Sequence, residues 1–308
     1  MKINTNISSL TAQEASTNTN RSIASSLEKL STGLKINKAS DDASGLAIAD
    51  KLRTQVTSIN QGISNGNSAI ALLQITDKSM AEQSKILDTI KAKLIQANTD
   101  TTSTAGRTAI AKDVTKLLQQ LNNVGEQTNY NGTTLLQNAR TTANASTLDN
   151  LTAVRTAKGG LSFQIGEGTA DLITTRTINA NVYGLSLTSL ATNVKVGATA
   201  GTAGATAGTT GVFTRTMASA GQASVDKAIT TLNGYRGDIG STQNQVESAV
   251  RNLMTQATNI KNAESVIRDV DYAEESANFN KLNIISQAGS YAISQSNAVS
   301  QNVLRLLQ

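Results

Sequence analysis

The sequence contains no cysteine, histidine, proline or tryptophan, and aromatic residues make up only 3% of its 308 residues. Without cysteine there is no disulfide, no thiolate metal ligand and no thiol nucleophile, and without histidine the commonest general base is missing. The lack of proline means that no residue imposes a kink on a helix. A hydrophobic core must therefore be built from Ala, Leu, Ile and Val, which is typical of packed helices.

Charged residues are also scarce, at 16% of the chain, and 27 basic residues stand against 22 acidic ones. The basic residues are scattered rather than clustered, so the small positive excess does not indicate a nucleic-acid partner. No stretch reaches the roughly eighteen apolar residues of a membrane span, and the first residues lack the charged-then-apolar pattern of a secretory signal. By these rules alone, we expect a cytoplasmic protein without nucleic-acid or membrane partners.

Apolar residues near the N-terminus recur every three or four positions, which predicts an amphipathic helix over residues 5–36. A break follows at residues 36–42, where Asp41 and Asp42 are suitable N-caps for the next helix. From residue 43 to about 98 the apolar residues recur every seven positions. A helix of that length spans about 80 Å and needs long partner helices.

The rest of the chain supplies such partners, because apolar residues have the same spacing over 110–124, 225–267 and 282–306. These repeats predict a mainly α fold: a long antiparallel helical bundle, or coiled-coil rod, built from both chain ends. The predicted rod core contains Leu52, Val56, Ile59, Ile63, Ile70, Leu73, Leu232, Ile239, Val246, Leu253 and Ile260. The two extreme ends are expected to serve assembly through seams formed by Ile23, Leu27, Leu30, Leu34, Ile285, Ala292, Val299, Val303 and Leu306.

The middle of the chain has a different pattern. Apolar and polar residues alternate over 161–165, and residues 172–178 are rich in Thr and Ile, so we predict a small β-hairpin around Gly166-Glu167-Gly168. Residues 197–211 are almost entirely Gly, Ala and Thr. Such a segment has little to bury and predicts an exposed loop or a vestigial outer domain.

No motif in the sequence predicts a catalytic, cofactor-binding or metal site. Gly166-x-Gly168 is only a fragment of a dinucleotide fingerprint and is better interpreted as a turn. Helix capping explains Asp41 with Asp42, and also Asp269 with Asp271, better than a pair of catalytic carboxylates does. The N-glycosylation pattern at Asn131, Asn144 and Asn150 is frequent by chance in a chain rich in Asn and Thr.

Several segments in the same order closely resemble the signatures of bacterial flagellins. Near the N-terminus these are residues 3–6, 27–37 and 41–49, and residues 128–136 are similar to the turn that follows the second rod helix of the family. Near the C-terminus the resemblance lies in residues 267–275 and 301–307. Together these motifs extend the likeness over about residues 1–180 and 220–308.

The resemblance implies a non-enzymatic subunit that polymerises with itself into the extracellular flagellar filament, the propeller of swimming bacteria. It implies an inner coiled-coil domain of residues 1–42 and 268–308, a helical rod of 43–180 and 218–267, and a short exposed loop or vestigial outer domain at 181–217. It also implies type III secretion by the flagellar export apparatus with a chaperone, and contacts with filament cap and hook-associated proteins. A hook–filament junction protein and a secreted helical adhesin or effector remain the alternatives.

The resemblance also bears on host recognition. Flagellins detected by Toll-like receptor five carry an Arg, and three positions later a Glu followed by Leu, where this chain has Thr89, Ala92 and Lys93; Lys91 keeps the basic character of the family. Lys93 is expected to place an unpaired ammonium against the receptor. The chain is therefore expected to be a short flagellin of the receptor-evading type.

Overall fold

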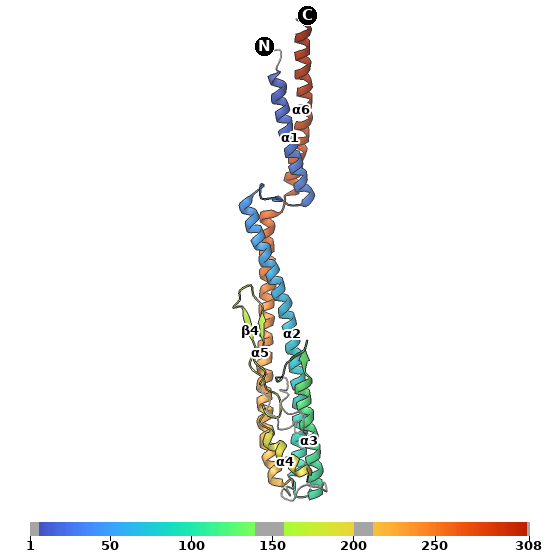
Figure 1. Ribbon diagram of the computed structural model, residues 1–308, viewed down its shortest axis with the longest axis vertical. Helices are drawn as coiled ribbons and strands as arrows, with labels where there is room; N and C mark the ends of the chain where they lie inside the picture. The colour runs from blue at the N-terminus through green and yellow to red at the C-terminus, as the bar shows by residue number, and fades with distance from the viewer. Residues whose placement is uncertain (1–5, 139–156, 200–211, 307–308) are drawn as a thin grey trace. The chain divides into compact units, whose positions relative to one another are not determined.

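The computed structural model describes residues 6–138, 157–199 and 212–306 of the chain (Figure 1). The described residues form the predicted mainly helical fold, with two small antiparallel sheets where the sequence predicts one β-hairpin. The helices are α1 (Ile7–Thr32), α2 (Ala43–Ala97), α3 (Thr104–Gln127), α4 (Thr188–Thr199), α5 (Arg215–Arg268) and α6 (Tyr272–Leu306). The strands are β1 (Asn129–Tyr130), β2 (Thr133–Thr134), β3 (Ser162–Gln164) and β4 (Leu172–Thr174).

The chain divides into two compact units, each of which combines segments that are distant in sequence. Unit 1 comprises residues 1–58 and 255–308, and unit 2 comprises residues 59–254. The domain limits expected from the sequence, at residues 42 and 268, follow the ends of the helices rather than these units. Those limits stay a prediction.

The first helix is shorter than the predicted 5–36, because both of its ends are capped. The side chain of Asn6 accepts a hydrogen bond from the Ser9 N–H at 3.1 Å, so the helix begins at Ile7. Gly33 has a φ of 74° and donates its N–H to the Lys29 carbonyl at 2.9 Å. A left-handed glycine directly after the last turn ends a helix. Gly33 is therefore the sequence signal for the end of this helix, and the spacing of apolar residues alone does not reveal it.

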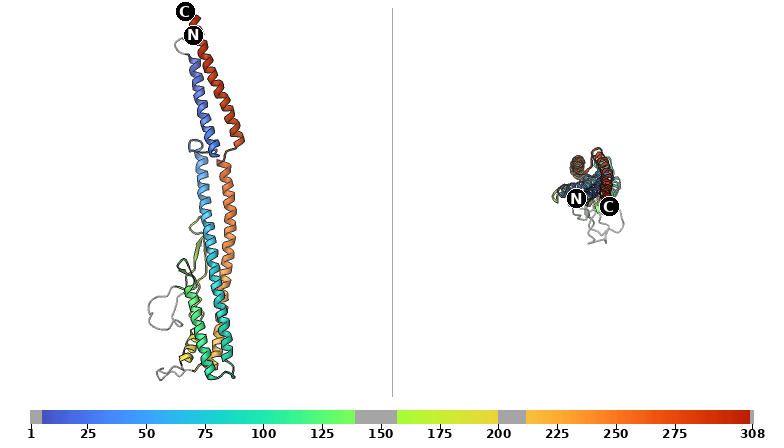
Figure 2. Two further views of the ribbon diagram at one scale, coloured as in Figure 1. Left: turned by 90° about the vertical axis from the view of Figure 1, so that its right-hand side faces the viewer. Right: turned by 90° about the horizontal axis from the view of Figure 1, so that it is seen from above.

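Unit 2 is organised around the antiparallel pairing of α2 with α5, which lie side by side in Figures 1 and 2. As residue numbers rise along α2, their partners fall along α5: Gly66 lies by Val250, Asp77 pairs with Arg236 and Lys91 pairs with Asp226. Residues at seven-residue spacing on both helices are buried between them, namely Ile59, Leu73, Met80, Leu87, Leu94, Val225, Leu232, Ile239 and Val246.

The predicted rod-core residues are placed as follows. Ile59, Leu73, Leu232, Ile239 and Val246 are buried in unit 2. Ile63, Ile70 and Leu253 are partly buried and pack against that core. Leu52, Val56 and Ile260 belong to unit 1 and are only half-buried.

The prediction of an exposed loop over 181–217 is wrong for residues 181–194 and for Phe213. Val182, Leu185, Leu187, Leu190, Ala191, Val194 and Phe213 are all buried in the core of unit 2, and α4 packs against α3. Buried amides hold this segment in place: Asn122 Oδ1 accepts the Val182 N–H at 2.9 Å, and Gln83 Nε2 donates to the Ala180 carbonyl at 2.7 Å. The Gly-, Ala- and Thr-rich part, residues 200–211, lies outside the described residues, as do Asn144 and Asn150.

The predicted β-hairpin is present as β3 and β4, paired antiparallel with Phe163 opposite Ile173. It contacts α2 very closely, since a Cβ built on Gly62 would lie 1.9 Å from the Ile165 carbonyl oxygen. Asn65 Nδ2 also donates to the Gln164 carbonyl at 3.1 Å. Only glycine at position 62 allows the two backbones to approach this closely. No helix of the described residues is long and apolar enough to span a membrane.

We expect Gly62→Ala to destabilise unit 2 by about 1–3 kcal/mol, because its methyl group must displace the hairpin backbone. The matched control is Gly234→Ala on α5, where an added Cβ has no atom within 4 Å. It should stabilise the chain by about 0.5–1 kcal/mol, since Ala is a better helix former. Urea unfolding of the monomer followed by circular dichroism measures both effects. Equal effects of the two substitutions would contradict the close approach.

Candidate assembly surface

In unit 1, α1 and α6 pair antiparallel along a seam with seven-residue spacing. The less exposed stripe of α1 is Ser9, Ala12, Ser16, Thr19, Ile23, Ser26 and Leu30, and that of α6 is Glu275, Phe279, Leu282, Ser286, Gly289, Ile293 and Ser296. Spacings of three and four residues place each stripe on one side of its helix. Hydrogen bonds between the two helices confirm that the stripes face each other.

Polar contacts make up part of this seam. The Ser26 hydroxyl donates to a carboxylate oxygen of Glu275. The Ser286 hydroxyl donates to Asn20 Oδ1 at 3.2 Å, and Asn6 Nδ2 donates to the Ser296 carbonyl at 3.2 Å. Only Ser26 is buried along α1. The large apolar residues of the seam, Ile23, Leu30, Phe279, Leu282 and Ile293, are each only half-buried.

Several other large apolar residues of the two helices face outward. Ile7 is 63% exposed, Ile284 67% and Tyr291 73%. Leu10, Leu27, Ile285 and Val299 are likewise exposed. We call the outward-facing residues Ile7, Leu10, Leu27, Ile284, Ile285, Tyr291 and Val299 the outer apolar surface.

The predicted assembly seam is split between these two faces. Ile23, Leu30 and Leu34 are half-buried, whereas Leu27, Ile285, Ala292 and Val299 are exposed. The side chains of Val303 and Leu306 lie outside the described residues. Sequence reasoning missed Phe279 and Ile293, which lie in the seam; the three- and four-residue spacing that joins them to Leu282 and Ser286 was the available signal.

A backbone junction joins the end of α1 to the start of α6. Leu34 and Asp269 form an antiparallel bridge, in which the Lys35 N–H donates to the Arg268 carbonyl at 2.7 Å. The Val270 N–H donates to the Gly33 carbonyl at 3.1 Å. Asp271 then caps α6, since its Oδ1 accepts the Ala273 N–H at 2.9 Å. The carboxylates near this junction are thus structural.

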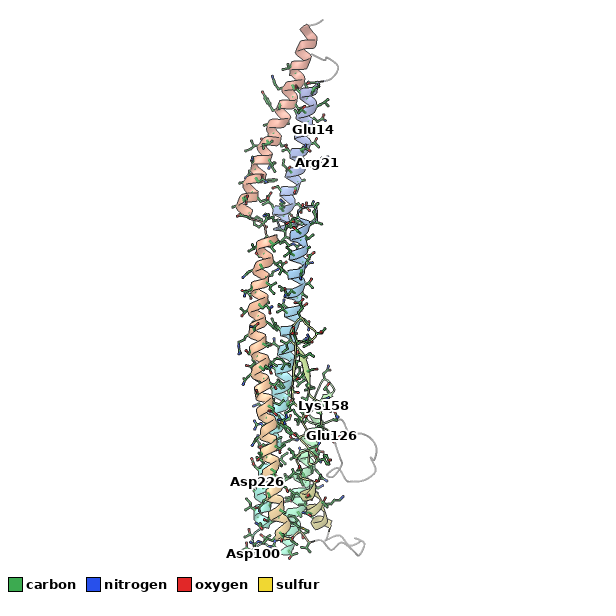
Figure 3. The ribbon with its side chains drawn as sticks, turned by 90° about the vertical axis from the view of Figure 1, so that its left-hand side faces the viewer. Glu14, Arg21, Asp100, Glu126, Lys158 and Asp226 are labelled. Atoms are coloured by element: carbon green, nitrogen blue, oxygen red, sulfur yellow. The ribbon has the colours of Figure 1, made fainter. Side chains whose placement is uncertain are left out.

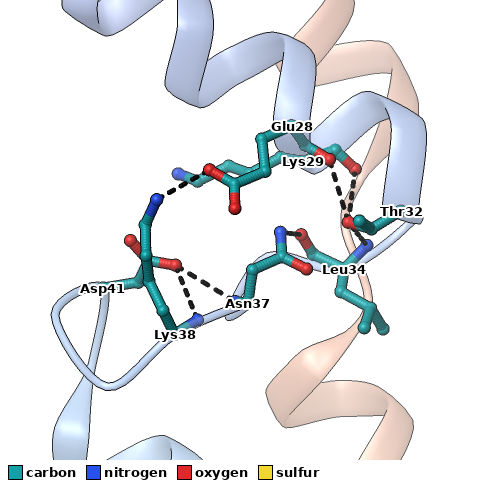
Figure 4. A network of polar contacts seen from close by, with 7 residues as sticks. All are labelled: Glu28, Lys29, Thr32, Leu34, Asn37, Lys38 and Asp41. Carbon is teal, nitrogen blue, oxygen red and sulfur yellow. Dashed lines mark hydrogen bonds and ion pairs between the residues drawn. The ribbon is translucent and has the colours of Figure 1, made fainter.

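The loop between α1 and α2 is held by polar contacts that Figure 4 shows. Asp41 Oδ2 accepts the backbone N–H groups of Asn37 and Lys38, both at 3.1 Å. These hydrogen bonds stabilise the carboxylate and hold the pKa of Asp41 below its ordinary value. The Lys38 ammonium lies 2.7 Å from Glu28, and the hydrogen bond between them raises the pKa of Lys38.

Asp42 caps the start of α2. Its Oδ1 accepts the N–H groups of Ser44 and Gly45, both at 3.0 Å, and the Ser44 hydroxyl at 2.8 Å. The hydrogen bond from Gly45 is the main cause that lowers the pKa of Asp42. Of the Asp41–Asp42 pair, only Asp42 caps the helix, whereas Asp41 holds the preceding loop. Within the described part of the chain, no group of three or more acidic side chains is arranged to hold a metal ion.

Comparison with known proteins agrees with this helical arrangement of the two chain ends. The family model of the bacterial flagellin N-terminal helical region matches residues 3–141, and that of the C-terminal helical region matches residues 223–307. The chain is 31% identical to the flagellin of Bacillus subtilis, with 100% of both chains covered. The chain belongs to the bacterial flagellin family.

Other relatives agree with this assignment. A flagellar filament 31.3 kDa core protein of Treponema maltophilum is 30% identical, again over 100% of both chains. As a flagellin, the chain is a structural subunit of the flagellar filament. A candidate hook-associated protein of Vibrio parahaemolyticus has a similar fold, with a TM-score of 0.55 and 11% identity over 74% of this chain and 99% of that one. At that identity the likeness concerns the fold alone, so the hook–filament junction protein is not favoured.

The residues predicted to correspond to the receptor epitope lie on one part of α2, where Lys91 pairs with Asp226 of α5, which Figure 3 labels. Thr89 and Ala92 are exposed, and the Thr89 hydroxyl donates to the Lys85 carbonyl at 2.9 Å. The Lys93 ammonium lies 3.1 Å from Asp113 on α3. The expectation that Lys93 is unpaired is therefore wrong, because α3 supplies a carboxylate that the sequence of α2 could not reveal.

The caps make the start of α2 sensitive to acid. A carboxyl whose pKa is lowered by folding stabilises the folded form above its ordinary pKa and loses this contribution as the pH falls through the lowered value. We expect the amide signals of Ser44 and Gly45 in the NMR spectrum of the monomer to change below pH 3.8, the ordinary value for Asp42. Asp42→Asn still accepts the hydrogen bonds and should remove the change. A midpoint at or above 3.8 would contradict the assignment.

Proposed function

We propose that the outer apolar surface of α1 and α6 is the surface through which copies of this flagellin polymerise. The observation that supports this is the burial pattern of unit 1, where no apolar side chain of the α1–α6 seam is fully buried and seven large apolar residues are exposed. Exposed apolar residues that share one face of a helix, as Ile7 and Leu10 do on α1 and Ile284 and Tyr291 on α6, favour a contact with another protein. A second copy of the chain is the partner that a filament subunit requires.

The energetics favour the same partner. Burying one Leu or Ile side chain contributes roughly 1.5–3 kcal/mol. The α1–α6 seam buries its Leu, Ile and Phe side chains only in part, so the pair is only marginally stable on its own. In a polymer, neighbouring copies cover the outer apolar surface and so add buried apolar area. The folding of α1 and α6 is thereby coupled to assembly. Contacts that repeat head to tail build an open helical polymer rather than a closed dimer.

We further propose that the subunit acts outside the cell and is carried there by the flagellar export apparatus. The absence of cysteine and proline supports passage as an unfolded chain, since no disulfide or slow prolyl isomerisation delays folding afterwards. Before assembly the outer apolar surface needs a cover, which a secretion chaperone would provide. In the filament, cap and hook-associated proteins would meet the ends of the polymer. The chain catalyses no reaction in this proposal.

Polymerisation tests the outer apolar surface directly. Ile284→Ser should raise the critical concentration of filament formation about tenfold or more, because the lost burial is roughly 1.5–3 kcal/mol. Gln287→Ser, at an exposed polar position of the same helix, is the matched control and should leave the critical concentration unchanged. Sedimentation of polymer from purified monomer measures both. Normal assembly of Ile284→Ser would contradict the proposal.

We also propose that this flagellin activates Toll-like receptor five poorly. Thr89 and Ala92 stand where recognised flagellins have Arg and Glu, and an Arg in such an interface can contribute more than about 2 kcal/mol. Both side chains are exposed, so changing them should leave unit 2 folded.

The receptor proposal is tested by gain of function. Thr89→Arg together with Ala92→Glu should raise the potency of purified monomer on reporter cells about tenfold or more, whereas Asp88→Glu on the same helix should not. High potency of the unmodified chain, equal to that of an Arg- and Glu-bearing flagellin, would show that the proposal is wrong.

A further inference from the structure

Three Asn-Gly dipeptides occur in the chain, and the structure places them in different backbone environments. They are Asn65-Gly66 in α2, Asn131-Gly132 between β1 and β2, and Asn233-Gly234 in α5. An Asn followed by Gly is the dipeptide most prone to deamidation, because glycine lacks the Cβ that would hinder attack by its nitrogen. The backbone around each dipeptide then decides whether that attack can occur.

Asn131-Gly132 is the least constrained of the three. The two residues form the turn of the β1–β2 hairpin, with φ values of 49° and 77°. Both are exposed, and a Cβ added to Gly132 would meet no atom within 4 Å. Among the described residues, neither the side-chain amide of Asn131 nor the N–H of Gly132 has a hydrogen-bond partner. Asn-Gly is also the preferred sequence for such a two-residue turn, so the reactive dipeptide comes with the turn itself.

The other two dipeptides are held within long helices. Asn65 donates to the Gln164 carbonyl and accepts from Gln61 Nε2 at 2.9 Å, and Gly66 is buried against Val250. Asn233 and Gly234 are exposed, like the turn residues, but lie within the 54-residue helix α5. In a helix the N–H of the glycine is hydrogen-bonded to the preceding turn and cannot approach its neighbour's side chain. Asn233 therefore serves as a control, because it is as exposed as Asn131 but its backbone is held in a helix.

We propose that Asn131 is the site at which this chain is modified by spontaneous deamidation. The Gly132 nitrogen, losing its proton to base, attacks Asn131 Cγ. The new N–Cγ bond closes a five-membered succinimide, while the Cγ–Nδ2 bond breaks and ammonia leaves. Water then opens the ring at either carbonyl and gives Asp or isoAsp, so each event adds one negative charge. Ring closure needs rotation of the backbone at residue 131, and only the two residue pairs of the hairpin oppose it.

The modification would alter the structure around the turn. Asp at this position tolerates the left-handed conformation, whereas isoAsp inserts an extra methylene into the backbone. The pairing of Asn129 with Thr134 depends on a two-residue turn, so isoAsp should release it. Leu135, whose N–H donates to the Thr128 carbonyl at 3.2 Å, is the next contact along the chain.

The test uses the full-length monomer incubated at neutral and mildly alkaline pH in water enriched in heavy oxygen. Peptide mass spectrometry then measures deamidation and label uptake at each of the three sites. Local opening of a short hairpin is far easier than opening the middle of a long helix, so Asn131 should react at least about tenfold faster than Asn233 or Asn65. The rate at Asn131 should rise with pH, and an isoaspartyl methyltransferase should label the product.

Two further measurements assign the difference to the fold. In urea the three sites should deamidate at similar rates, because each then presents the same dipeptide. Gly132→Ala should slow the reaction at Asn131 in both folded and unfolded chains, since the added methyl group hinders the attacking nitrogen. Deamidation of Asn233 as fast as that of Asn131 in the folded monomer would overturn the proposal. So would a preference for Asn131 that persists unchanged in urea.

Discussion

The antiparallel pairing of α2 with α5 is the interaction on which the rest of unit 2 depends. Each helix is too long to be stabilised by local contacts, and each has an apolar stripe with seven-residue spacing that only a partner of similar length can cover. The partner comes from the opposite half of the chain, so the sequence between them must fold back along the pair. Helices α3 and α4 and the β3–β4 hairpin pack on this pair, and their side chains complete its core.

Close backbone approach and buried amides fix the positions of these inserted segments. Gly62 lets the hairpin reach the surface of α2, and Asn65 holds its carbonyl there. The side chains of Gln83 and Asn122 hydrogen-bond to the backbone of residues 180–182, where backbone polar groups would otherwise be buried without partners. Apolar packing holds the bundle together, and these few polar contacts decide how the connecting segments lie on it.

Unit 1 uses helix pairing for a different purpose. In α1 and α6 the inward stripe combines half-buried apolar residues with hydrogen-bonded polar ones, and further large apolar side chains are left exposed. Such a pair resembles half of an interface more than a finished core. In a flagellin this arrangement makes chemical sense, because a subunit that completed its own apolar core at both ends would have little reason to polymerise. The caps at Gly33, Asp42 and Asp271 end and restart the helices without using apolar residues.

Helices α1, α2, α3, α5 and α6, the β3–β4 hairpin and the capping role of Asp42 follow from the sequence alone, because each rests on periodicity or on residues that are neighbours in the chain. Helix α4 does not, since the sequence predicts an exposed loop there. Matching apolar stripes near both termini also favour pairing of the two chain ends. Only the tertiary structure decided which side of α1 and α6 forms the seam, because heptad spacing allows more than one choice of stripe. The burial of Val182 to Val194 and the pairing of Lys93 with Asp113 were likewise set by α3, whose position depends on contacts between residues far apart in sequence.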